Sequence, residues 1–145
     1  MRKILIIHGP NLNLLGTRER EIYGKMTLKA INSNLNKYAK NKKISLKIVQ
    51  TNWEGEIIDL IQKAKGKFDG IIINPAAYTH YSIAIYDTIL AVGIPTIEVH
   101  LSNIYKREEF RRKSVIAPAC VGQICGLGWK SYILGIDALL EFLDK

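Results

Sequence analysis

A glutamate and a histidine two residues apart, Glu98 and His100, are the most chemically suggestive pair in this chain of 145 residues. On a β-strand, this spacing points both side chains to the same face. A carboxylate beside an imidazole holds the ring in one tautomer and favours its charged form, as a general acid requires. The alternative is a solvated strand end with incidental polarity. The spacing alone leaves both interpretations open.

Further polar residues collect where apolar runs end. Three such clusters occur, at residues 8–13 after the run 3–8, at 74–80 after 69–74, and at 98–103 after 95–100. In an open parallel sheet, ligands bind beyond the carboxyl ends of the strands, near the point where the strand order reverses. We therefore expect the three clusters to converge on one crevice, although asparagines beside a His-Gly-Pro turn are often only turn residues.

The connection formed by residues 12–26 is long for a compact α/β unit. Loops of more than about 12 residues without regular structure are usually functional or disordered. This one contains apolar residues such as Leu15 and Ile22, so its composition is not that of a disordered segment. One interpretation is a lid that carries Arg18 and Tyr23 over the crevice, and the other is a packed surface loop.

Several kinds of site lack their sequence signature. The chain has neither a Gly-x-Gly-x-x-Gly nor a Walker motif, and so no obvious phosphate cradle. Its two cysteines, Cys120 and Cys125, come without the paired histidines of a metal site. If both stood on one strand they would lie on opposite faces about 16 Å apart, too far for a disulfide. We therefore expect no metal, and reduced thiols in a cytoplasmic protein.

The elements that would position the polar clusters alternate along the chain. Apolar and alternating runs predict strands over 3–8, 44–51, 69–74, 95–100 and 120–125. Helical spacing of apolar residues predicts helices over 27–41, 53–65 (capped by Asn52), 82–92 and 129–144. Five β units separated by helices predict one α/β domain, a flavodoxin-like three-layer sandwich with a parallel sheet of order 2-1-3-4-5.

The composition limits the possible partners. A hydrophobic fraction of 48% excludes wholesale disorder, and no run approaches the ~20 apolar residues of a membrane helix. The net charge of +8 invites nucleic acid, an anionic membrane or an acidic small molecule. A basic nucleic-acid-binding module is disfavoured because the lysines spread over several predicted helices, with no basic stripe interleaved with aromatic residues.

Taken in order, the motifs of the chain resemble type II 3-dehydroquinate dehydratases over essentially its whole length. They are His8–Arg18 with Ile22–Gly24, Trp53–Asp59, Asn74–His80, Glu98–Asn103, Arg107–Arg111 and Gly122–Gly128. The resemblance implies a flavodoxin-like lyase that converts 3-dehydroquinate to 3-dehydroshikimate, in the shikimate pathway of aromatic amino-acid biosynthesis or in quinate breakdown. It also implies no metal, no cofactor and no Schiff-base lysine, and a homo-oligomer that is commonly a dodecamer of four trimers.

The resemblance also implies roles in the reaction. Tyr23 corresponds to the base that removes the proton α to the ketone, and Arg18 to the cation that this base needs. A phenol is mostly protonated at neutral pH, and a charge about 4 Å away contributes ~4 kcal/mol at an effective dielectric near 20. Asn11 corresponds to the residue that stabilises the enolate through a water. His100, oriented by Glu98, corresponds to the acid that protonates the leaving hydroxyl.

Substrate binding is implied for a second set of residues. The carboxylate would be held by Asn74 and by the backbone N–H groups of Leu101 and Ser102, which form an anion nest. His80 and Arg111 correspond to residues that hold ring hydroxyls. Asp87 corresponds to a residue that reaches the site of a neighbouring subunit, and without the resemblance it is simply a solvent-exposed helix carboxylate.

Three residues depart from the family pattern. Arg20 stands where a proline is frequent, Tyr81 where a small hydroxyl residue is frequent, and Tyr86 where an arginine is frequent. These departures remove no catalytic atom, and bear on the order of the 12–26 segment and on subunit contacts. A catalytically silent relative, kept as a binding or scaffold protein, is the other alternative.

Overall fold

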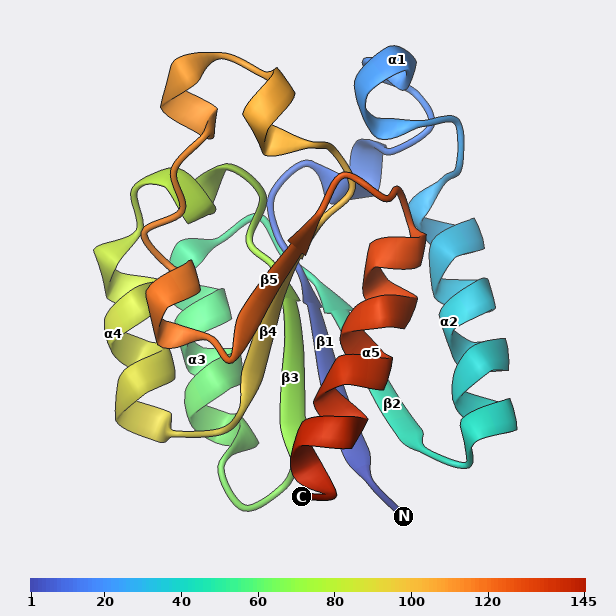
Figure 1. Cartoon of the computed structure of the whole chain (residues 1–145), viewed down its shortest axis with the longest axis vertical. Helices are drawn as coiled ribbons and strands as arrows, with labels where there is room; N and C mark the ends of the chain where they lie inside the picture. The colour runs from blue at the N-terminus through green and yellow to red at the C-terminus, as the bar shows by residue number, and fades with distance from the viewer.

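A computed structural model describes all 145 residues and places a five-stranded parallel sheet at the centre of the molecule (Figure 1). The strand order is β2-β1-β3-β4-β5, which confirms the predicted α/β, flavodoxin-like topology. The strands are β1 (Lys3–His8), β2 (Ser45–Gln50), β3 (Gly70–Asn74), β4 (Thr96–His100) and β5 (Gly122–Cys125). The principal helices are α2 (Leu28–Lys42), α3 (Glu54–Ala64), α4 (Ile83–Val92) and α5 (Lys130–Leu143).

The helices cover both faces of the sheet, α2 and α5 on one side and α3 and α4 on the other (Figure 1). Strand β1 shows why its apolar run is continuous, because alternate residues point to opposite faces. Ile4 and Ile6 belong to the core cluster that includes Ile31 of α2 and Ile136 of α5. Leu5 and Ile7 belong to the cluster on the other face, with Ile57 of α3 and Ile85 of α4. No helix of the chain is long and apolar enough to cross a bilayer.

Two local predictions are wrong. The fifth strand begins at Gly122, and Cys120 lies in the turn that follows the 3-10 helix η5 (Ala117–Ala119). The two thiols therefore do not share a strand, although both are free, as expected. Asn52 does not cap α3, since Trp53 holds the N-cap position and has no side-chain cap bond. The Asn52 side chain accepts hydrogen bonds from the Asn11 N–H and from Gln50 instead, which fastens the loop after β1.

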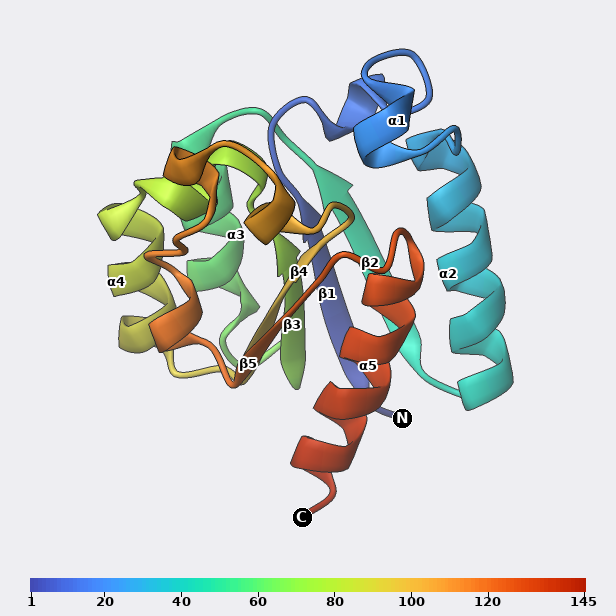
Figure 2. The same cartoon turned by 45° about the horizontal axis from the view of Figure 1, so that its top comes forward.

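All five strands run in the same direction, so their carboxyl ends lie along one edge of the molecule, opposite both chain termini (Figure 1). The long connections gather over this edge (Figure 2). They carry the short helices η1 (Leu12–Leu14), α1 (Arg20–Tyr23), η2 (Ala76–His80), η3 (Ile104–Lys106) and η4 (Glu109–Arg111). Short helices in these connections let side chains from distant parts of the sequence face one another above the strand ends.

Candidate active site

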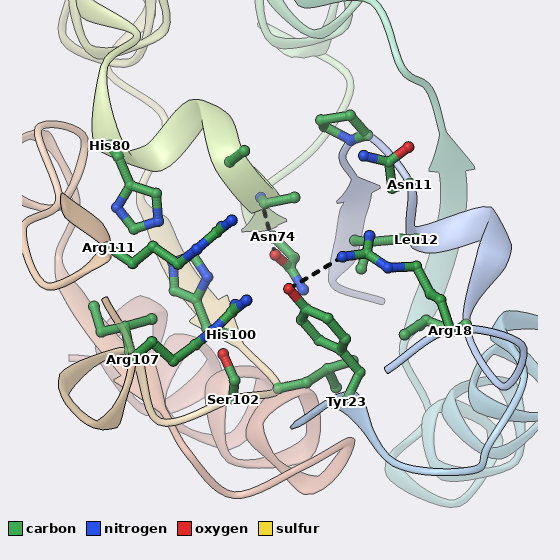
Figure 3. Close-up of a pocket in the computed structure, with 16 residues that line it drawn as sticks. Asn11, Leu12, Arg18, Tyr23, Asn74, His80, His100, Ser102, Arg107 and Arg111 are labelled. Carbon is green, nitrogen blue, oxygen red and sulfur yellow. Dashed lines mark hydrogen bonds between the residues drawn. The ribbon is translucent and has the colours of Figure 1, made fainter. Parts of the chain in front are cut away.

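A pocket opens above the carboxyl ends of β1, β3 and β4, where the polar clusters were expected to meet (Figure 3). Two of the predicted site residues do not line it. Glu98 is fully buried behind His100, and Asp87 is exposed on α4. The predicted residues that do line the pocket are Asn11, Arg18, Tyr23, Asn74, His80, His100, Leu101, Ser102 and Arg111.

Glu98 and His100 occupy alternate positions of β4 and share one face of the sheet, as their spacing predicts. The Nε2 atom of His100 lies 2.5 Å from Oε2 of Glu98. The carboxylate also accepts hydrogen bonds from Thr79, Gln123 and Ser114. Burial alone would raise the pKa of Glu98, but the bonds from His100, Gln123 and Ser114 outweigh it and hold the pKa below its usual range.

This arrangement fixes the tautomer of His100. An ionised carboxylate can only accept hydrogen bonds, so Nε2 of His100 must carry a hydrogen and donate it to Glu98. The other ring nitrogen, Nδ1, has no partner in the chain, and His100 lines the pocket. Nδ1 is therefore the atom that can give a proton to a bound molecule.

Tyr23 lies between two arginines. Arg18 Nη2 is 3.4 Å from the Tyr23 hydroxyl, and the Arg18 guanidinium is 4.7 Å from the ring centroid. The guanidinium of Arg107 also lies over the ring, at 5.0 Å. Cations over an aromatic face are attracted by the ring quadrupole.

The sequence did not single out Arg107, although it lies in the strongly charged 105–113 segment that follows β4. Its side chain is only 11% exposed, and its buried Nε has no hydrogen-bond partner. Arg107 Nη2 is 3.9 Å from Glu19, and Arg18 is 3.5 Å from the same carboxylate. Arg107 therefore connects the wall of the pocket to the 12–26 segment.

The 12–26 segment contains regular structure, the helices η1 and α1. It carries Arg18 and Tyr23 to the rim of the pocket. The departure at Arg20 supplies a contact of its own, since its Nε donates to the Gly16 carbonyl at 2.8 Å. This bond closes the turn that precedes α1.

Anion-binding groups lie at the ends of β3 and β4. The backbone N–H groups of Leu101 and Ser102 donate to no acceptor within the chain, although both residues are buried. Asn74 uses its Oδ1 to accept from the Ala76 N–H at 3.1 Å, and its Nδ2 donates to Tyr132 at 3.0 Å. An amide nitrogen carries two hydrogens, so one N–H of Asn74 remains for a ligand.

His80 and Arg111 line the same pocket from η2 and η4. His80 Nδ1 lies 2.8 Å from the Lys113 carbonyl, which can only accept, so the second ring nitrogen is left without a hydrogen when the ring is neutral. Burial lowers the pKa of His80 and favours that neutral form. Arg111 is held through its Nε by Glu108, at 3.1 Å.

Asn11 takes up the left-handed backbone conformation, with φ 69°, at the end of the loop after β1. Its N–H is fixed by Asn52, and its side chain lies at the edge of the pocket (Figure 3). No group of three or more His, Cys, Asp or Glu side chains is arranged to hold a metal ion. Together, the residues of the site provide a buried carboxylate–imidazole pair, a phenol between two cations, and several unpaired N–H donors.

Comparisons with known proteins agree with this arrangement over nearly the whole chain. The family model described as dehydroquinase class II matches residues 2–140. A 3-dehydroquinate dehydratase of Geotalea daltonii is 58% identical over 99% of both chains. The one from Caldicellulosiruptor saccharolyticus is 60% identical, also over 99% of both chains. The crystal structure of a type II dehydroquinase from Butyrivibrio crossotus is 52% identical, with a TM-score of 0.94 over 96% of this chain and 97% of that one.

Proposed function

The chain belongs to the class II dehydroquinase family, and from that membership we propose how its pocket performs the family's reaction. It is a 3-dehydroquinate dehydratase, a hydro-lyase of the shikimate pathway that removes water from 3-dehydroquinate to give 3-dehydroshikimate. The observation that best supports the proposed mechanism is the placement of a phenol between two arginines across the same pocket from a carboxylate-bound imidazole.

Tyr23 is proposed as the base. The reaction begins when a proton leaves the carbon next to the ketone, and an ionised phenol on the 12–26 segment can accept it. Arg18 and Arg107 support this role, since Arg18 Nη2 lies 3.4 Å from the hydroxyl and both guanidinium groups lie close to the ring. The negative charge of the phenolate then passes to the enolate oxygen of the substrate.

Asn11 and His100 are proposed to act on the two oxygens that change charge. The side-chain amide of Asn11, at the edge of the pocket, would hold a water that donates a hydrogen bond to the enolate oxygen. The charged imidazolium of His100 would give its Nδ1 proton to the leaving hydroxyl, so that water departs in an anti elimination. Glu98 stabilises the imidazolium through the bond at Nε2.

The substrate is proposed to bind as an anion. The free N–H of Asn74 and the backbone N–H groups of Leu101 and Ser102 would hold its carboxylate. His80 and Arg111, which line the same pocket, would hold its ring hydroxyls. In this proposal the net charge of +8 reflects solvated lysines and a few arginines that attract a small anion, rather than a nucleic acid.

The experiment that tests this function measures the conjugated enone of 3-dehydroshikimate. Purified protein mixed with 3-dehydroquinate is expected to produce ultraviolet absorbance that rises with enzyme concentration. Treatment with a chelator or with borohydride should leave the rate unchanged, because neither a metal nor a lysine Schiff base takes part. Tight binding of 3-dehydroquinate without any enone would identify a silent relative instead.

We further propose that the working unit is a homo-oligomer, a dodecamer of four trimers. Exposed apolar side chains at the start of α3, just before α4 and on α4 support it, namely Trp53, Tyr81, Ile83 and Leu90, which are 73%, 62%, 65% and 54% exposed. Large apolar patches on a monomer mark interaction sites. Asp87 is exposed on the same helix as Ile83 and Leu90, so a neighbour seated on this surface would receive its carboxylate.

The two free thiols support a cytoplasmic setting.

Light scattering tests the assembly. The measured molar mass is expected to be twelve times the 16.4 kDa of one chain. Ile83→Asp places a charge on the proposed contact and should release smaller species with lower activity. Leu134→Asp is the matched control, because Leu134 is also exposed (43%) but lies on α5, which covers the other face of the sheet. A monomeric wild type with full activity would contradict the proposed trimer and the role of Asp87.

A further inference from the structure

A row of buried polar side chains runs from helix α2 through the core to Asn74 at the floor of the pocket. His8 Nε2 is 2.8 Å from Asn32 Oδ1, and His8 Nδ1 is 2.8 Å from the Tyr132 hydroxyl. The same hydroxyl is 3.0 Å from Asn74 Nδ2. His8 and Tyr132 are both fully buried, and neither lines the pocket. The reaction described above makes no use of either residue.

The direction of every hydrogen bond in this row follows from one backbone group. The N–H of Ala76 can only donate, so the Asn74 atom that faces it must be Oδ1. Nδ2 of Asn74 therefore faces Tyr132 and donates to it. The Tyr132 hydroxyl must then donate its hydrogen bond to His8 Nδ1, since no other acceptor lies within reach. His8 consequently carries its hydrogen on Nε2 and donates it to Asn32.

The electrostatics agree with this single arrangement. Burial lowers the pKa of His8 to about 4, although the bond to Asn32 opposes the shift. Burial also raises the pKa of Tyr132, against the bond from Asn74. Both side chains are therefore neutral across the physiological range. A charged His8 would have hydrogens on both ring nitrogens and would leave the buried Tyr132 hydroxyl hydrogen without an acceptor.

We propose that Tyr132 and His8 are positioning residues for substrate binding, which hold the Asn74 amide so that its remaining N–H faces the substrate carboxylate. The proposal rests on the proposed binding role of Asn74. Two contacts fix the amide plane: Ala76 at its oxygen and Tyr132 at one hydrogen of its nitrogen. Without the Tyr132 hydroxyl, only the Ala76 contact would restrain it. Substrate binding would then have to order the Asn74 amide, and the free energy that this ordering costs would weaken the affinity.

The first test replaces Tyr132 by phenylalanine, which keeps the ring and removes the hydroxyl. The carboxylate is present in both the bound substrate and the transition state, so loss of its partner affects the two equally. We expect Tyr132→Phe to raise KM for 3-dehydroquinate by about tenfold and to change kcat by less than about twofold. Tyr38→Phe is the matched control, since Tyr38 donates to Asp137 outside the pocket, and its KM should stay at the wild-type value.

Two readouts separate positioning from a merely structural role. The inhibition constant of quinate, which carries the carboxylate, should rise about tenfold in Tyr132→Phe, whereas that of quinate methyl ester should not. In addition, Tyr132→Phe should add nothing to KM when Asn74 is already alanine. Equal weakening of acid and ester, or independent effects in the double variant, would overturn the proposal.

His8 provides a conservative rescue that does not depend on the Tyr132 variant. In His8→Asn, the Oδ1 atom stands where Nδ1 stood and can accept the Tyr132 hydrogen, so KM should remain near the wild-type value. His8→Leu has no acceptor and should behave like Tyr132→Phe. Equal KM values for the two His8 variants would overturn the proposal. If the wild type forms no enone, the proposed function fails instead. If Asn74→Ala leaves KM unchanged, the proposed role of Asn74 fails.

Discussion

Replacement of Tyr23 by phenylalanine is expected to lower kcat for enone formation by roughly 10³-fold while the protein stays folded. The variant keeps the ring, and so keeps the stacking of Arg18 and Arg107 over it. It loses only the oxygen that would take the proton from the substrate. Substrate binding should change little, because the proposed carboxylate donors belong to β3, β4 and the residues that follow them. Ultraviolet assays of kcat and KM measure the effect.

The control for this variant is Tyr105→Phe. Tyr105 is 58% exposed on η3 and its hydroxyl has no partner in the chain, so its loss should leave kcat unchanged. Circular dichroism and thermal unfolding of both variants should match the wild type. If Tyr23→Phe retains kcat within a few-fold of the wild type, the base is a different group, and the two arginines serve the substrate directly.

Substitution of Glu98 by glutamine is expected to reduce both activity and stability. The carboxylate accepts hydrogen bonds from His100, Thr79, Ser114 and Gln123. Glutamine would turn an NH₂ group toward some of these donors, and it would remove the charge that stabilises the imidazolium. We expect kcat to fall roughly 10²-fold, and the free energy of unfolding to fall by about 3 kcal/mol, the magnitude typical of a broken buried pair.

The pH dependence of stability gives this prediction a second measurement. Because the pKa of Glu98 is lowered below its ordinary value of 4.5, the folded protein keeps this carboxylate ionised where the unfolded chain takes up a proton. Its contribution is therefore present above about pH 4.5 and is lost as the pH falls toward the folded value. Urea unfolding of Glu98→Gln should lack this loss, whereas Glu109→Gln, an exposed control, should retain it. Identical acid profiles for the wild type and Glu98→Gln would contradict the argument.

The fold could be predicted from the sequence because its signals are local and repeated. The apolar run of β1 fills both faces of the sheet, and the run of β3 is buried at every position. Ser82 caps α4, and Gly93, with φ 75°, ends it at the position where a glycine is expected. Strand and helix boundaries agree with their predicted ranges to within two residues.

The errors occur where tertiary contacts override local preference. Asn52 is a good helix cap by residue type, but its oxygen accepts from Asn11 and Gln50 of neighbouring segments. Cys120 continues an apolar stretch in the sequence, yet the chain is still turning there through η5. Neither the partners of Asn52 nor the turn at Cys120 can be predicted from the neighbouring residues in the sequence.

The residues at the ends of the strands could be predicted to lie at one site, whereas the site residues of the long connections were harder to predict. Strand periodicity predicts that Glu98 and His100 share one face of the sheet, and Asn74 ends the apolar run that forms β3. Tyr23 depends on the resemblance of the whole motif, since a tyrosine in a long connection has no distinguishing local pattern. Arg107 was missed because its contact with Tyr23 joins segments more than 80 residues apart, and nothing in the charged 105–113 segment separates one arginine from the next.

The 12–26 segment and the sheet differ in local stability. Helix α1, which carries Tyr23, has no buried residue, and Glu19 meets Arg18 and Arg107 in partly exposed ion pairs. His100 stands on a strand buried at every position. Segments with few buried contacts open far more readily than core strands. An opening of α1 would therefore displace the proposed base, Tyr23, and would leave the proposed acid and carboxylate donors in place for the next substrate.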